Sequence, residues 1–161
     1  MVSNRKIDRI GDLLKKEVSP SPDDLRVLLD WRNHFSPILE YYHTKIKNSI
    51  DDKTIVALAK RLKRIESIQI KLKRFRTMRL STIQDIAGVR VVLTNEKALM
   101  SAFSALRNRS SRNLLKRLDD YHASPKDDGY RGMHLIYENA HSTMIEIQLR
   151  TELEHIWATA V

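Results

Sequence analysis

Within residues 144–150, the six residues from Ile145 onward alternate strictly between apolar and polar side chains. The apolar set is Ile145, Ile147 and Leu149, and the polar set is Glu146, Gln148 and Arg150. Because successive side chains of a strand leave opposite faces, this alternation predicts a strand with one packed face and one polar face. A glutamate suits the middle of a strand poorly unless it has a ligand or a partner. The polar face is therefore a candidate site, and a structural ion pair between Glu146 and Arg150 is the alternative.

The composition sets limits on the class of protein. The chain has 161 residues, 42% of them hydrophobic, which suffices for a globular domain with its own core. It contains no cysteine, which excludes disulfides, thiolate zinc sites and a cysteine nucleophile and agrees with a reducing compartment. The start of the chain lacks the apolar segment of a signal peptide, and no apolar run reaches the ~20 residues of a membrane helix. We therefore expect a cytoplasmic protein without a membrane partner.

Positive charge is concentrated between residues 60 and 79. This stretch holds nine Lys and Arg residues and one acid, Glu66, whereas the whole chain has a net charge of +9. Such a cluster is typical both of nucleic-acid interfaces and of sites for strongly anionic small ligands. The spacing of the surrounding residues has to separate these two possibilities.

Helical patterns occupy the first part of the chain. Apolar residues recur at helical spacing up to about Lys16. Ser21, Pro22 and the two acids after them have the composition of a helix start, and Pro37 predicts a break. We expect residues 1–53 to form a helical section that packs on the rest of the protein.

From residue 54 onward, short strands alternate with helices. The expected strands are 60–65, 89–93, 133–137 and 144–150, and the expected helices are 67–75, 96–106 and one capped by Thr151 with Glu154. Residues 107–124 are polar and basic, and we expect a helix end and a mobile loop there. The layout predicts an α/β fold with a mixed sheet of about five strands flanked by helices. The last helix has no C-cap signal, so we expect the chain to be truncated at its C-terminal end.

Asp85 is a candidate metal ligand. It stands just before the predicted strand 89–93, close to Gly88. Mg²⁺ prefers one or two carboxylates together with substrate phosphates, and Glu146 supplies a second carboxylate. The alternative for Asp85 is an ordinary turn or cap aspartate.

Other polar residues have the pattern of a nucleotide site. Arg61 and Lys63 share one face of a strand, and Ser67 and Lys71 lie one helical turn apart on the next helix. Cations beside the N–H groups of a helix start suit a triphosphate. Tyr130, in a glycine-containing loop, is expected to be exposed and to stack on a purine, with an ordinary hairpin tyrosine as the alternative.

Four groups of residues occur in a characteristic order and spacing. They are Arg61-Leu-Lys63 with Ser67 and Lys71; Gln84-Asp85-Ile-Ala-Gly88-Val-Arg90; Pro125-Lys126 with Gly129-Tyr130-Arg131 and His134; and Glu146-Ile-Gln148-Leu-Arg150-Thr151 with Trp157. Together they resemble the synthetase domain of the RelA/SpoT family, here expected over residues 54–161. The resemblance implies a nucleotidyltransferase-like synthetase fold. It also implies transfer of the β,γ-pyrophosphate of ATP to the 3′-hydroxyl of GDP or GTP, which makes (p)ppGpp.

The resemblance also implies a role for each residue. Asp85 and Glu146 would bind Mg²⁺, the implied cofactor, and Glu146 would activate the 3′-hydroxyl as well. The residues implied for ATP are Arg61, which would stack on adenine, and Lys63, Ser67 and Lys71 near the phosphates. The residues implied for GDP or GTP are Tyr130, which would stack on guanine, and Lys126, His134, Gln148 and Arg150.

Three alternatives stay open at this point. Asp128 stands where family members often carry serine or asparagine, and an acid there would repel acceptor phosphates. A toxin-type relative that pyrophosphorylates tRNA 3′ ends or adenine nucleotides is therefore one alternative, and the basic residues between 107 and 117 suit an RNA acceptor. Gly129 and Gly132 also match the GxxG loop of KH domains, so a non-catalytic RNA-binding module is another. A regulator that binds nucleotide without reacting is the third. A homo-oligomer is possible in each case.

Overall fold

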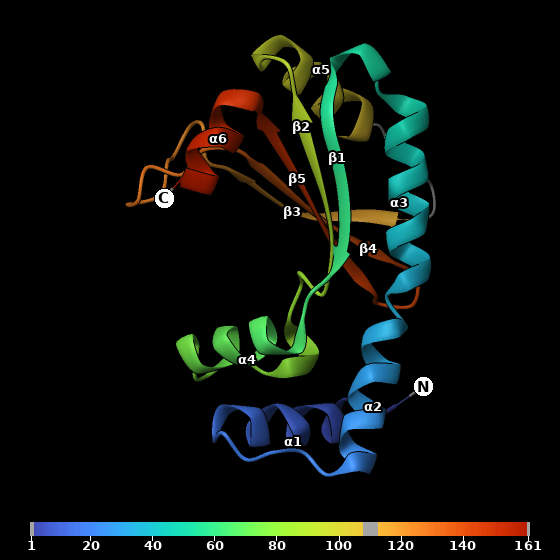
Figure 1. Cartoon of the computed structure of the whole chain (residues 1–161). Helices are drawn as coiled ribbons and strands as arrows, with labels where there is room; N and C mark the ends of the chain where they lie inside the picture. Colours follow the sequence, from blue (N-terminus) through green and yellow to red (C-terminus); the bar gives the residue numbers. More distant parts are fainter. Residues whose placement is uncertain (1, 108–112, 161) are drawn as a thin grey trace.

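The computed structural model describes residues 2–107 and 113–160. Figure 1 shows a twisted sheet with α3 standing along it, and α1, α2 and α4 gathered at one end. The helices are α1 (Asn4–Lys15), α2 (Pro22–Asn33), α3 (Ser36–Ser49), α4 (Ile65–Arg74), α5 (Glu96–Arg107) and α6 (Glu152–Ala160), with 3₁₀ turns η1 (Asp52–Thr54) and η2 (Leu80–Thr82). The strands are β1 (Ile55–Leu62), β2 (Ala87–Leu93), β3 (Asn113–Asp120), β4 (Met133–Asn139) and β5 (Met144–Thr151).

The five strands form one mixed sheet in the order β1-β2-β5-β4-β3. β2 and β5 run parallel, whereas the other neighbouring pairs are antiparallel. The α/β fold with a mixed sheet of about five strands, expected from the sequence, is thereby confirmed. The parallel pair at the centre of the sheet carries Asp85 at its edge and Glu146 within it.

The N-terminal helices begin and end as the sequence predicts. Ser21 caps α2 by accepting a hydrogen bond from the backbone N–H of Asp24, and Pro22 occupies the first turn. Pro37 lies in the first turn of α3, so the chain breaks between α2 and α3. Side chains of α1 and α3, such as Ile7 and Tyr42, belong to the same apolar core as the strands. The helical section and the sheet therefore fold around one core.

The boundaries of the first strand and the following helix differ from those predicted. β1 ends at Leu62, not at residue 65, and α4 begins at Ile65, not at residue 67. The backbone N–H of Lys63 donates a 2.7 Å hydrogen bond to the carbonyl of Ile86. After this hydrogen bond the chain turns into α4. Ser67 therefore lies in the first turn of this helix.

The helix end and loop expected over residues 107–124 are wrong for residues 113–120, which form a strand. Arg107 ends α5, and residues from Asn113 to Asp120 form β3, an edge strand paired with β4. This strand buries little, since Leu114 is 63% exposed, and it carries a bulge between Leu115 and Arg117. β3 is held in the sheet by backbone hydrogen bonds to β4, so its sequence lacks the alternation of apolar and polar side chains that would predict a strand. Residues 108–112 of the expected loop lie outside the described residues.

The end of the fold follows the predicted pattern. The apolar set of β5 is completely buried, with Ile145, Ile147 and Leu149 at 0% exposure. Thr151 and Glu154 form the expected capping box, in which each side chain binds the backbone N–H of the other at 3.3 and 2.8 Å. In the part of the chain that the structure describes, no helix has the length and apolarity to cross a membrane.

Candidate active site

The register of the sheet places Arg61 and Glu146 on either side of a glycine. Gly88 of β2 pairs with Arg61 of β1 and with Glu146 of β5. A Cβ atom added to Gly88 would meet only the backbone oxygen of Glu146, at 3.9 Å, so the space above Gly88 is open. The cavity here has a volume of about 80 Å³, and its charged and amide lining residues are Lys60, Arg61, Asp85, Arg90, Glu146 and Gln148.

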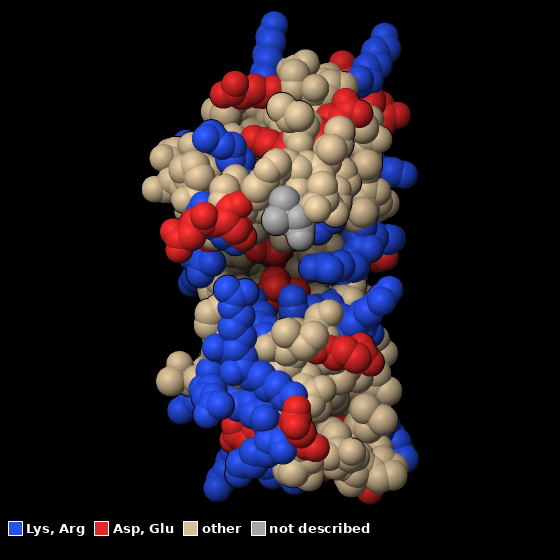
Figure 2. Space-filling view, turned by 60° about the vertical axis from the view of Figure 1, so that its left-hand side comes forward, with Lys and Arg blue, Asp and Glu red and all other residues tan. Residues whose placement is uncertain are grey.

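The surface around the site is strongly charged. Figure 2 shows a recess near the middle of the molecule, with acidic atoms deep inside it and Lys and Arg atoms along its margins. The two acidic residues that line the cavity are Asp85 and Glu146. The cavity thus combines these two carboxylates with lysine and arginine side chains, as a metal-bound polyphosphate requires.

Two lysines neutralise Asp85. Lys63 Nζ and Lys71 Nζ each lie 2.8 Å from one carboxylate oxygen of Asp85, whose side chain is 15% exposed. Burial alone raises the pKa of the Asp85 carboxyl, but hydrogen bonds and charge from both lysines outweigh it, so the pKa lies below its ordinary value. Asp85 is therefore the centre of an ion-pair cluster, and the ordinary turn or cap alternative does not describe it.

The N-terminal section fixes the backbone that carries Lys63. Arg32 of α2 donates from Nε to the carbonyl of Lys63 at 2.7 Å and from a terminal nitrogen to the carbonyl of Leu62 at 2.9 Å. These bonds give partners to two carbonyls at the end of β1, which is an edge strand of the sheet. Of the other residues implied for ATP, Arg61 is exposed at the cavity and Ser67 is half-buried in the first turn of α4.

Glu146 is held by residues of β4 and β5. Nδ1 of His134 lies 2.9 Å from one carboxylate oxygen of Glu146, and Gln148 donates to the other at 2.7 Å. Burial raises the pKa of Glu146, but the hydrogen bonds from His134 and Gln148 outweigh it, so the pKa lies below its ordinary value. The ion-pair alternative with Arg150 is not seen, because in the described residues Arg150 binds Tyr130 and Gln148 instead.

The expected exposed position of Tyr130 is wrong. Its side chain is buried, at 8% exposure, because three polar neighbours surround it. Arg150 Nε donates to the Tyr130 hydroxyl at 2.9 Å, and this hydroxyl lies 2.7 Å from His134 Nε2. The Arg150 guanidinium and the Lys126 ammonium each lie 4.7 Å from the centre of the Tyr130 ring. The residues implied for the acceptor therefore form one connected group.

Asp128 has a structural role in the loop before Tyr130. Its side chain accepts a 3.0 Å hydrogen bond from the backbone N–H of Tyr130, a bond that serine or asparagine can also make. Gly129 has a positive φ of 78° and packs against Trp157 of α6. The loop joins β3 to β4, so the KH alternative, whose GxxG loop joins two helices, is wrong.

Two residues of this region had no role assigned to them in the sequence predictions. Arg90 lines the cavity, and its Nε lies 3.4 Å from Gln148 Oε1. The period-two rule applied to β2 would have found Arg90, since it shares a face with Gly88. Tyr121 lies after β3, and its ring centre is 5.6 Å from that of Tyr130. The contact was not predicted because this segment was expected to be a mobile loop.

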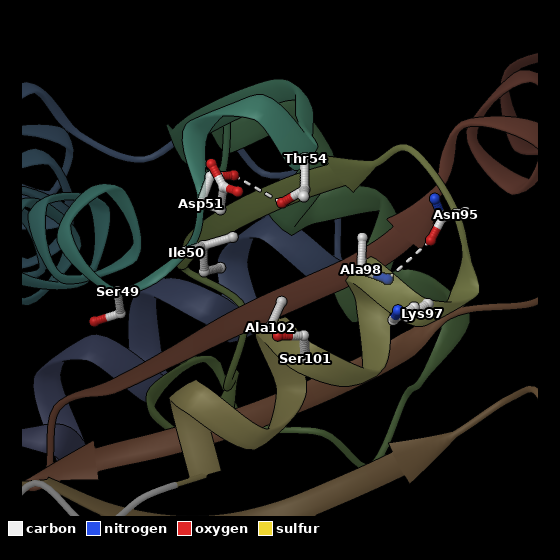
Figure 3. Close-up of a pocket in the computed structure, with 9 residues that line it drawn as sticks. All are labelled: Ser49, Ile50, Asp51, Thr54, Asn95, Lys97, Ala98, Ser101 and Ala102. Carbon is white, nitrogen blue, oxygen red and sulfur yellow. Dashed lines mark hydrogen bonds between the residues drawn. The ribbon is translucent and has the colours of Figure 1, made fainter.

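A second cavity, of about 270 Å³, lies between η1 and the start of α5 (Figure 3). Its polar groups already serve the backbone. Asn95 Oδ1 accepts from the N–H of Ala98 at 2.9 Å, and Thr54 donates to the carbonyl of Asp51 at 2.7 Å. The cavity contains none of the residues predicted for the site, and its polar contacts are those of helix and turn caps.

Comparison with known proteins identifies the class of enzyme to which this fold and site belong. The family described as "Region found in RelA / SpoT proteins" matches residues 60–161. This match spans more than half of the chain and all four motif groups. Such proteins are nucleotide-using synthetases, and the chain belongs to the RelA/SpoT family.

Individual relatives agree with this assignment. The chain is 30% identical to GTP pyrophosphokinase YwaC of Bacillus subtilis, over 85% of its own length and 76% of the relative's. The small alarmone synthetase 1 of B. subtilis, solved with its product pppGpp, is 26% identical with a TM-score of 0.68, covering 78% of this chain and 73% of that one. Small alarmone synthetase 2 of B. subtilis is 28% identical with a TM-score of 0.69, covering 81% and 77%. The predicted family and synthetase fold are thus confirmed.

Proposed function

We propose that this chain is a GTP diphosphokinase, which transfers the β,γ-pyrophosphate of ATP to the 3′-hydroxyl of GDP or GTP and so makes (p)ppGpp. The observation that carries the proposal is the cavity that holds both Asp85 and Glu146 beside Arg61 and Arg90. Relatives named GTP pyrophosphokinase and a neighbour solved with pppGpp as its product support the same reaction. Tyr130, Lys126 and Arg150 supply the aromatic ring and the cations for the acceptor.

The ATP side of the site uses the lysines that now neutralise Asp85. Lys63 and Lys71 are held within 2.8 Å of a carboxylate, so they are already placed around a negative charge. Phosphate oxygens of ATP offer these lysines an equivalent anion, with Ser67 in the first turn of α4 beside them. Arg61, exposed at the cavity, is the residue we assign to the adenine base.

The two carboxylates fit a magnesium ion. Asp85 and Glu146 line the same cavity, and both pKa values lie below the ordinary range, so both groups are ionised at neutral pH. No group of three or more His, Asp or Glu side chains gathers to hold a metal within residues 2–107 and 113–160. One or two carboxylates completed by substrate oxygens and water is the arrangement typical of Mg²⁺. Bound there, Mg²⁺ supplies neutralisation of the charge on the transferred group.

On the acceptor side, we assign the 3′-hydroxyl to a position next to Glu146. Bonds from His134 and Gln148 fix the Glu146 carboxylate, which can still accept a proton from the 3′-hydroxyl. Arg90, which lines the cavity, stabilises charge on the pyrophosphoryl group during transfer. The reaction therefore depends on positioning and electrostatics, without a covalent enzyme intermediate.

The names of the relatives favour a guanine nucleotide as acceptor over tRNA or an adenine nucleotide. We assign the reaction to the cytoplasm, where its nucleotide substrates are held, and self-association of the chain stays a prediction.

The direct test is a comparison of acceptors. Purified protein is incubated with ATP labelled in its γ-phosphate, Mg²⁺ and one of GDP, GTP, AMP or deacylated tRNA, and products are separated by thin-layer chromatography or gel. We expect label in GDP and GTP, and none in the same reactions with the Glu146→Gln variant. Label only in tRNA or AMP, or no transfer to any acceptor, would contradict the proposal.

A further inference from the structure

Lys126 lies between two tyrosine rings. Its Nζ atom is 4.5 Å from the centre of the Tyr121 ring and 4.7 Å from that of Tyr130. The two rings meet edge to face, at 73° and 5.6 Å, and His134 lies edge to face with both, at 5.1 and 5.6 Å. The ammonium group thus occupies an aromatic corner beside Glu146, the residue nearest the proposed chemistry.

The backbone around this corner is fixed, whereas the lysine side chain is free to turn away. Tyr121 N–H donates to the carbonyl of Gly132 at 2.9 Å, and the carbonyl of Lys126 accepts from Gly129 at 2.8 Å. Lys126 itself is exposed, and no described carboxylate lies within ion-pair distance of its Nζ atom. Its ammonium is therefore held here by the two rings, through the attraction of a cation to a π face.

The other cation on Tyr130 has different constraints. Arg150 is buried, at 7% exposure, and is tied to the Tyr130 hydroxyl at 2.9 Å. It therefore belongs to the fixed frame of the corner, and Lys126 is the part that can leave. A base that stacks on Tyr130 needs the ring surface that the Lys126 ammonium now covers.

We propose that Tyr121 is the second aromatic wall of the acceptor base site, and that Lys126 occupies this site until the guanine base displaces it. The inference rests on the proposed function, because it concerns the acceptor of that reaction. On displacement, the ammonium loses two π contacts and requires a new anionic partner. A phosphorylated acceptor carries that partner with it, whereas a nucleoside does not. Lys126 therefore selects guanine nucleotides over guanosine by making base entry depend on a phosphate.

The test uses opposite changes in two affinities. Lys126→Ala opens the corner and removes the phosphate ligand, so guanosine should bind about five- to thirtyfold more tightly, the factor of two exposed cation–π contacts. GDP should bind about tenfold or more weakly, the factor of a lost charged contact. Both dissociation constants are measured by equilibrium dialysis with labelled guanosine and labelled GDP. If GDP weakens while guanosine affinity is unchanged or reduced, Lys126 is only a phosphate ligand and the inference is overturned.

Variants of Tyr121 test the second wall. Tyr121→Leu removes the ring and should weaken guanosine and GDP by a similar factor of about fivefold or more, as for one base stack. Tyr121→Phe keeps the ring and should bind both ligands like the wild type. Unchanged guanosine affinity in Tyr121→Leu, with a melting temperature like that of the wild type, would show that Tyr121 is no part of the base site.

Two controls separate this inference from the proposed function. Lys97→Ala removes one positive charge from α5, in the second cavity, and should change neither affinity. Wild-type protein is assayed in parallel for transfer of labelled pyrophosphate to GDP. If the wild type transfers pyrophosphate but the guanosine and GDP affinities of Lys126→Ala do not change in the expected directions, only the inference is overturned. If the wild type binds GDP but transfers no pyrophosphate, only the proposed function is overturned.

Discussion

Nδ1 of His134 lies 2.9 Å from a carboxylate oxygen of Glu146, and this contact joins the acceptor residues to the proposed catalytic base. The opposite ring nitrogen, Nε2, lies 2.7 Å from the Tyr130 hydroxyl, which accepts a bond from Arg150. An ionised carboxylate can only accept, so Nδ1–H of His134 donates to Glu146, and the His134 ring links Glu146 to Tyr130. The position of the Glu146 carboxylate therefore depends on His134.

Substitutions of His134 test this dependence. His134→Phe removes the donor to Glu146 and should lower kcat about tenfold or more, while the KM for ATP changes little because the ATP residues are untouched. His134→Asn keeps an N–H group near the position of Nδ1 and should retain clearly more activity than His134→Phe. Steady-state kinetics with each substrate varied separately measure both effects. Equal loss in the two variants would show that the contact with Glu146 is not what matters.

The cluster of Lys63, Lys71 and Asp85 gives a test that separates charge balance from catalysis. Asp85→Asn leaves two lysine charges without their anion, and we expect a loss of about 1–3 kcal/mol in the free energy of unfolding together with loss of transfer. Adding Lys63→Met removes one of these charges and should recover part of the stability but none of the activity. Urea denaturation and the transfer assay measure the two properties. Recovery of activity in the double variant would mean that Asp85 is only a structural counter-ion.

The same carboxylate predicts a pH dependence of stability. The pKa of Asp85 lies below its ordinary value of 3.8, because Lys63 and Lys71 outweigh the opposing effect of burial. Its contribution to stability is therefore complete above that value and is lost as the pH falls through the lower pKa of the folded state. Unfolding free energies measured between about pH 7 and pH 2 should fall less steeply at the acid end in Asp85→Asn than in the wild type. Parallel curves would contradict the assignment.

Arg90 is expected to act on the transferred group. It lines the cavity with Glu146 and Asp85, so its removal takes one cation from the place where phosphate charge develops. Arg90→Gln should lower kcat/KM about 10- to 100-fold, the effect of one charged hydrogen bond of about 1.5–3 kcal/mol. Arg117→Gln, on β3 and paired with Asp119, is the matched control and should keep wild-type kinetics. Similar kinetics in the two variants would exclude Arg90 from the site.

The sequence predicted those parts of the fold that depend on local patterns. The alternation in β5, the capping box of Thr151 and the break at Pro37 each follow from neighbouring residues, and the structure has all three. β3 was missed because an edge strand is formed by backbone pairing with β4, which leaves little trace in exposed side chains such as Leu114.

The candidate site was predictable as a set of residues but not as a set of contacts. The sequence named Asp85, Lys63 and Lys71 for different ligands, and only the fold shows that they bind one another. The burial of Tyr130 likewise depends on Arg150, twenty residues away in the chain. Pairings of this kind are set by the sheet register and by loop closure, which a linear pattern does not contain.

The most direct measurement follows both ends of ATP in one reaction. Protein, Mg²⁺ and GDP are incubated with ATP labelled in the α-phosphate and, in parallel, with ATP labelled in the γ-phosphate, for the wild type and for Glu146→Gln. The proposed reaction predicts that the α label appears in AMP and the γ label in a tetraphosphorylated guanosine, both only with the wild type. Appearance of the α label in ADP would contradict pyrophosphate transfer by this site. So would a γ label that stays in ATP or is released as free phosphate.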